Sequence, residues 1–158
     1  LAMIPLLSIS RNFFLGAEPV SGPLRMLDIK HADRVTREAL ERGIEQARPG
    51  HYLADISAAV QQHVEQNGLS VVREFVGHGI GTQLHEEPQV PNYATSARGP
   101  KLKAGMVLAI EPMVTTGSPE VKIQPDRWTA VTADGSYAAH FEHCVAVTQN
   151  GPWILTTP

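Results

Sequence analysis

Residues 74–89 read EFVGHGIGTQLHEEPQ, and this stretch decides how the rest of the chain is interpreted. His78 and His85 lie seven residues apart, and glycines flank His78 on both sides. The spacing does not suit two ligands on one helix face, where neighbours are three or four residues apart. The glycines remove side-chain bulk and allow another backbone to approach closely. A lone histidine in such a loop is usually just exposed, so its meaning depends on partners elsewhere in the sequence.

Helical periodicity comes before this stretch, and short apolar runs come after it. Apolar spacing predicts one helix over residues 24–47, ended by Pro49-Gly50, and a second over residues 53–66. Strands are predicted over residues 8–15, 70–75, 106–114, 128–132, 137–148 and 153–156, with a hairpin at Ala133–Ser136. Residues 76–104 are rich in glycine, proline and polar residues, which predicts a long functional loop. Helices followed by antiparallel strands indicate an α+β fold.

Length and composition limit the classes of protein to consider. A chain of 158 residues fits a single domain over residues 1–158. The net charge of −3 argues against a nucleic-acid or membrane partner. One cysteine, Cys144, excludes an internal disulfide and favours a reducing compartment, so we expect a cytoplasmic protein. The apolar residues 1–10 are too few to span a bilayer and lack the charged start of a signal, so we expect a buried strand or an interface.

Two glutamates interrupt apolar runs. Glu111 lies in MVLAIEPMV (106–114), and Glu142 lies in AHFEHCVAV (139–147). A buried carboxylate without a partner costs several kcal/mol, so each needs a cation, a proton or hydrogen-bond donors. A strand end that reaches solvent is the alternative for each glutamate alone. Both glutamates together with His78 indicate a shared site.

The other five histidines need no functional explanation from the sequence. Roles on the surface or in the core suffice for His31, His51, His63, His140 and His143. On a strand, alternation turns His143 to the face opposite Glu142.

Four runs together resemble one enzyme family, the methionine aminopeptidases. They are TREALERGIEQARPG (36–50), GHGIGTQLHEEPQVPNY (77–93), LKAGMVLAIEPMV (102–114) and FEHCVAVTQNG (141–151). The resemblance covers roughly residues 11–157. It implies the pita-bread fold, an α+β scaffold of two pseudo-symmetric halves. It also implies hydrolysis of the N-terminal methionine from peptides with two divalent metals.

The resemblance carries roles to individual positions of this sequence. Metal ligands are implied at His78, Glu111 and Glu142, and a substrate-contacting histidine at His85. Trp128 falls near the pocket for the methionine side chain. Leu84 stands where many relatives have an aromatic pocket residue, which implies an altered pocket.

The sequence also departs from the family pattern. The family has two further aspartate ligands and an upstream catalytic histidine. Counted back from Gly16, the second aspartate falls near Ser8, and residues 1–17 hold no acidic residue. We therefore expect a truncated pita-bread scaffold, the C-terminal half, with impaired aminopeptidase activity. Its three remaining ligands predict at most one weakly held Mn, Fe, Co or Zn ion.

Two other readings stay open. Without metal, Glu111 and Glu142 would share a cleft, and one would keep a proton while the other ionises. In a glycoside hydrolase one carboxyl group of such a pair is the acid, and the other is the base or the nucleophile. His78 or His85 could adjust the pKa of the pair or donate a hydrogen bond to it. The third reading is a non-catalytic fragment. In each case exposed sheet edges predict a homodimer, with residues 1–7 in the interface.

Overall fold

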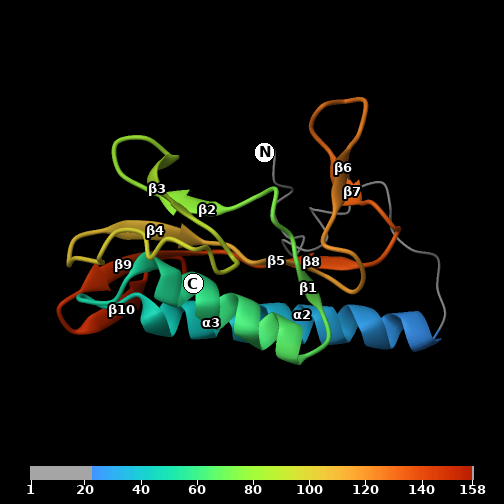
Figure 1. Ribbon diagram of the computed structural model, residues 1–158, viewed down its shortest axis with the longest axis horizontal. Helices are drawn as coiled ribbons and strands as arrows, with labels where there is room; N and C mark the ends of the chain where they lie inside the picture. The colour runs from blue at the N-terminus through green and yellow to red at the C-terminus, as the bar shows by residue number, and fades with distance from the viewer. Residues whose placement is uncertain (1–22, 158) are drawn as a thin grey trace.

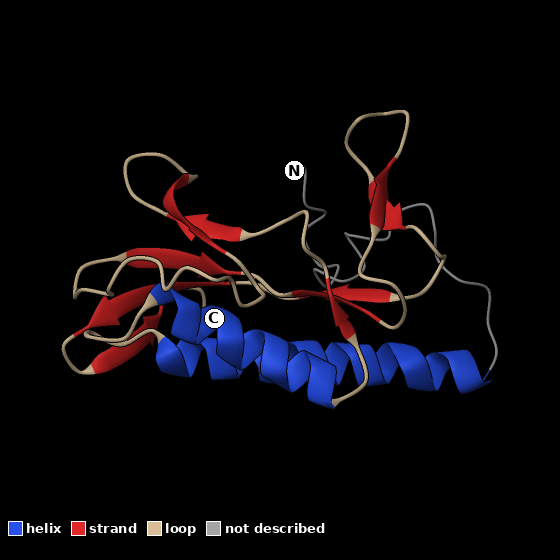
Figure 2. Ribbon diagram, viewed as in Figure 1, coloured by secondary structure: helices blue, strands red, loops and turns tan. Residues whose placement is uncertain are grey.

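The computed structural model describes residues 23–157 as a layer of two helices covered by antiparallel sheets (Figure 1). Helices α2 (Pro23–Gln46) and α3 (Leu53–Gln66) lie side by side and come first in the chain. Over residues 70–154 ten short strands follow, and Figure 2 shows the strands in red above the blue helices. This order confirms the α+β prediction. The strand predicted over residues 8–15 and the apolar segment 1–10 lie outside the described residues.

Both helices agree with their predicted bounds to within a residue. Proline at the first position of α2 suits a helix start, since its fixed φ is already helical. Val35, Leu40 and Ile44 are buried along α2, and Ile56 and Val60 along α3. None of the helices among residues 23–157 is long and apolar enough to cross a bilayer.

Two sheets lie over the helices. The first has the order β1 (Ser70–Val71), β5 (Met113–Thr115) and β8 (Ala138–His140). The second has the order β10 (Gly151–Ile154), β9 (His143–Thr148), β4 (Val107–Ile110), β2 (Gly77–Gly79) and β3 (Glu86–Val90). Helix α2 contacts strands of both sheets, and side chains of both sheets join the helices in one core. The hairpin of β6 (Val121–Ile123) and β7 (Ala130–Thr132) projects away from the helices (Figure 1).

Two predicted strands are each divided in two, and the division creates the site. The run 106–114 breaks at Glu111-Pro112 and passes from β4 in one sheet to β5 in the other. The run 137–148 breaks at Phe141-Glu142, between β8 and β9. Proline has no N–H to donate to a ladder, which explains the first break.

Other strand predictions were wrong in detail. The predicted strand 70–75 is only the short β1, and the predicted loop 76–104 contains β2 and β3. The predicted hairpin at Ala133–Ser136 does not form, because β7 pairs with β6 while β8 pairs with β5. The last strand begins at Gly151, before the predicted start at residue 153.

Candidate functional site

The two glutamates are neighbours because both strand breaks lie at the same place. Strands β4 and β9 pair antiparallel, with Ile110 opposite His143. Glu111 follows β4 directly and Glu142 precedes β9 directly, so the register places the two carboxylates next to each other. Neither glutamate is part of a strand, which corrects the view of them as mid-strand residues.

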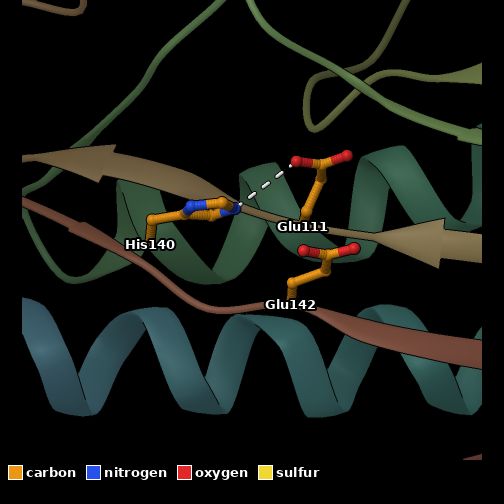
Figure 3. Close-up of side chains that lie close together, drawn as sticks. All are labelled: Glu111, His140 and Glu142. Atoms are coloured by element: carbon orange, nitrogen blue, oxygen red, sulfur yellow. Dashed lines mark ion pairs between the residues drawn. The ribbon is translucent and has the colours of Figure 1, made fainter. Parts of the chain in front are cut away.

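A histidine completes a cluster of three with these glutamates. One carboxylate oxygen from each of Glu111 and Glu142 and a ring nitrogen of His140 lie within 4.8 Å of one another (Figure 3). His140 Nε2 is 3.4 Å from Glu111 Oε2, and both side chains are only 14% exposed. From the sequence we expected only a surface or core role for His140. A signal was available, because residues two apart on a strand share a face and His140 is two residues before Glu142.

His78 lies on the other side of Glu111. It is the middle residue of β2, opposite Ala109 of β4, and its Nε2 is 3.5 Å from Glu111 Oε1. Its Nδ1 is 3.0 Å from the carbonyl oxygen of Gly79, and because that oxygen only accepts, Nδ1 donates. In the neutral ring the lone pair of Nε2 then faces the carboxylate, the side on which a cation would be bound. This tautomer is the one in which Nε2 binds metals.

The glycines on both sides of His78 allow the backbones of β4 and β3 to approach β2 closely. A Cβ on Gly77 would meet the carbonyl oxygen of Ala109, and a Cβ on Gly79 would meet the carbonyl oxygen of Glu87. The close backbone approach predicted from the glycines is therefore present.

His85 lies beside His78, although it belongs to the exposed loop between β2 and β3. The ring centroids of His78 and His85 are 4.1 Å apart, with the planes tilted by 45°. Leu84, its neighbour in this loop, is 69% exposed. Trp128 is 61% exposed and lies in the turn of the β6–β7 hairpin. Pocket roles for Leu84 and Trp128 stay predictions.

A buried amide supports the break that carries Glu111. Asn92 is 1% exposed, and its Nδ2 donates to the carbonyl oxygen of Glu111 at 3.1 Å. The bond satisfies a backbone group at the point where β4 ends. This contact could not be predicted from the sequence, because Asn92 and Glu111 are far apart along the chain.

The cluster has a surplus of negative charge in apolar surroundings. Burial, and then the charge of Glu111, raise the pKa of Glu142 above its ordinary value, and His140, His78 and His85 offset part of this. Burial and the same two carboxylates also raise the pKa of the Cys144 thiol. A bound cation would offset the part of each shift that comes from the neighbouring carboxylates.

The residues present fit a divalent transition metal. Carboxylates and imidazoles are the donors that Mn, Fe, Co and Zn accept in proteins. Two carboxylates offset the two positive charges of one ion. All three clustered side chains are partly buried, which limits competition from water.

Comparisons with known proteins agree with this chemistry. The sequence pattern of metallopeptidase family M24 matches residues 7–149. The methionine aminopeptidase of Clostridium perfringens is 59% identical over 123 residues, covering 78% of this chain and 49% of that protein. Methionine aminopeptidase 1 of Bacillus subtilis is 54% identical, covering 82% of this chain and 52% of that protein.

Solved structures agree as well. The methionine aminopeptidase of Thermotoga maritima matches with a TM-score of 0.79 and 52% identity, covering 82% of this chain and 52% of that one. The enzyme of Rickettsia prowazekii matches with a TM-score of 0.80 and 40% identity, covering 83% and 53%. These matches confirm the pita-bread scaffold. The chain spans about half the length of the curated relatives it matches.

Proposed function

Because the chain belongs to metallopeptidase family M24, we propose that it carries metal-binding residues of an aminopeptidase that releases N-terminal methionine from peptides. The observation that carries the proposal is the meeting of Glu111 and Glu142 beside His78 and His140. The names of the relatives, methionine aminopeptidases, supply the substrate class.

Glu111, Glu142 and His78 are the residues that would hold a divalent Mn, Fe, Co or Zn ion. When bound, such an ion polarises an amide carbonyl and lowers the pKa of a bound water. The two carboxylates also keep the ion in place by charge. We propose one ion for these two carboxylates, whose two negative charges match its two positive charges.

Substrate contacts are proposed from the loop and the hairpin. His85 is exposed beside His78, a position from which its ring reaches a peptide bound over the cluster. Leu84 and Trp128 are exposed apolar side chains suited to a methionine side chain. Leucine in place of an aromatic residue would alter how tightly that side chain is held.

A chelator experiment tests the proposal. The protein is stripped with EDTA, assayed on a methionyl peptide, and assayed again after addition of Co²⁺ or Mn²⁺. We expect activity that disappears on stripping and returns with metal, and that Glu111→Gln or Glu142→Gln removes. His143→Gln is the matched control, since that histidine bonds Thr156 instead of the cluster. Activity that chelator leaves unchanged would contradict a metal-dependent reaction.

A carboxylate-pair hydrolase is the second candidate, and the distance between the glutamates favours it. One oxygen of Glu111 and one of Glu142 lie no more than 4.8 Å apart. Retaining glycosidases also hold their two carboxyl groups close together, at roughly 5–5.5 Å. Glu142, with its raised pKa, would be the acid and Glu111 the nucleophile. Turnover of an aryl glycoside in EDTA, lost in Glu111→Gln, would support this candidate. An absence of such turnover would remove it.

A further inference from the structure

His140 lies as close to Glu111 as His78 does, but it is next to the other carboxylate oxygen. The two Nε2–carboxylate distances are 3.4 Å for His140 and 3.5 Å for His78. His140 and Glu142, with Glu111, form the one group of three potential ligands among the residues that the structure describes. Figure 3 shows the ring of His140 and both carboxylates gathered at one place.

The separations suit a single ion. Ligand atoms about 2.1 Å from a tetrahedral metal lie roughly 3.4 Å from one another. The distance between His140 Nε2 and Glu111 Oε2 is 3.4 Å, and the 4.8 Å limit of the cluster leaves only small side-chain movements to be made.

The backbone fixes His140 in this position. His140 is the last residue of β8 and pairs with Met113 of β5, two residues after Glu111. His78 comes from β2 in the other sheet. The two histidines therefore approach Glu111 from different sheets, and a neutral imidazole from β8 adds a donor without changing the charge balance.

We propose that His140 is a direct ligand, through Nε2, of a divalent ion held with Glu111 and Glu142. This inference rests on the proposed metal-dependent function and assigns a ligand that neither the sequence motifs nor the family resemblance implied. With this ligand, the nitrogen donors come from β8 of one sheet as well as from β2 of the other.

Metal binding by the purified apoprotein tests the inference without any activity assay. Calorimetry with Zn²⁺ and Co²⁺ would compare the wild type with His140→Ala and His140→Gln, and with His143→Gln as the matched control. We expect the affinity to fall tenfold or more in both His140 variants and to stay within twofold in the control. Circular dichroism and thermal unfolding in EDTA would establish that each variant is folded.

A spectroscopic readout separates a ligand from a residue that only positions Glu111. In ¹⁵N-labelled protein, Zn²⁺ should shift the Nε2 resonance of His140 and leave that of His143 unchanged. An unshifted Nε2 resonance at saturating Zn²⁺ would overturn the inference, even if affinity falls. Wild-type affinity in both His140 variants, with binding lost in Glu111→Gln and Glu142→Gln, would overturn it and leave the proposed function standing. No binding by the wild type would overturn both.

Discussion

At the scale of single residues, Glu142 couples the site to pH. Burial and the charge of Glu111 raise its pKa in the folded chain, so the folded state binds this proton more readily than the unfolded state. The stability gained from the proton is complete below the unfolded value of about 4.3 and is lost as pH rises through the raised folded pKa. The metal-free protein therefore loses stability as this carboxylate ionises.

The comparison of wild type with Glu142→Gln isolates this effect. We expect the free energy of unfolding of the wild type, relative to the variant, to fall as pH rises from 4 to 8 in EDTA. Urea unfolding at each pH measures the free energy of unfolding of both proteins. Groups with lowered pKa values, such as Asp134 at about 2, are present in both proteins, so their contributions cancel when the two free energies are subtracted. A difference that stays constant or rises with pH would contradict the prediction. Saturating Zn²⁺ should reverse the trend, because the ion favours the ionised carboxylate.

The site residues differ in how readily the sequence reveals them. Glu111 and Glu142 were identifiable because a carboxylate in an apolar run needs a partner. His78 was identifiable because its flanking glycines indicate close packing. His140 was missed, since a histidine near a strand end has many ordinary roles. Asn92 could not be identified, because its bond to Glu111 depends on how the loop returns to the sheet.

At the scale of elements, the short strand β2 sets the position of His78. A methyl group on Gly77 would meet the backbone carbonyl oxygen of Ala109, which cannot move without breaking the pairing of β2 with β4. We expect Gly77→Ala to lower the free energy of unfolding by about 3 kcal/mol, the upper range for overpacking. Metal affinity should fall as well, because His78 would be displaced.

Gly68→Ala is the control for this prediction. Gly68 has φ of +75° with nothing near its Cβ position, so alanine there meets only the backbone cost of about 1–2 kcal/mol. Urea unfolding and calorimetry of both variants separate crowding from backbone strain. Equal losses of stability, with metal affinity unchanged in Gly77→Ala, would show that β2 tolerates the extra methyl group.

The helices were predictable from the sequence, and the strands only in part. Helix α3 is amphipathic, and its bounds follow from local spacing and from Asn67-Gly68. The strands depend on pairing partners far along the chain. The run 106–114 reads as one strand because its apolar residues continue past Glu111, whereas the chain changes sheets there. Asp134-Gly135 has the sequence of a hairpin turn, but β7 and β8 each find another partner.

At the scale of the whole molecule, the edge strands of the larger sheet bear on the oligomeric state. Among the described residues β10 and β3 are the two edge strands of this sheet, and Trp153 on β10 is 64% exposed. Exposed edges with apolar side chains pair with other chains, and a charged residue blocks such pairing. We expect a homodimer that Trp153→Lys shifts toward monomer, as measured by sedimentation velocity. Ile123→Lys, on the projecting β6–β7 hairpin, is the control; a wild-type monomer at all concentrations would contradict the prediction.

The charge of the whole site predicts how many ions one chain binds. Glu111 and Glu142 bring two negative charges, and the histidines near them bring none when they act as ligands. A second divalent ion would lie about 3.5–4 Å from the first and would leave two positive charges uncompensated in a half-buried place. We therefore expect one Co²⁺ per chain, counted by calorimetry and by elemental analysis after gel filtration. Glu111→Gln should reduce this to none, since it removes half of the compensating charge from the centre of the cluster. Two tightly held ions per chain would show that carboxylates beyond these two contribute.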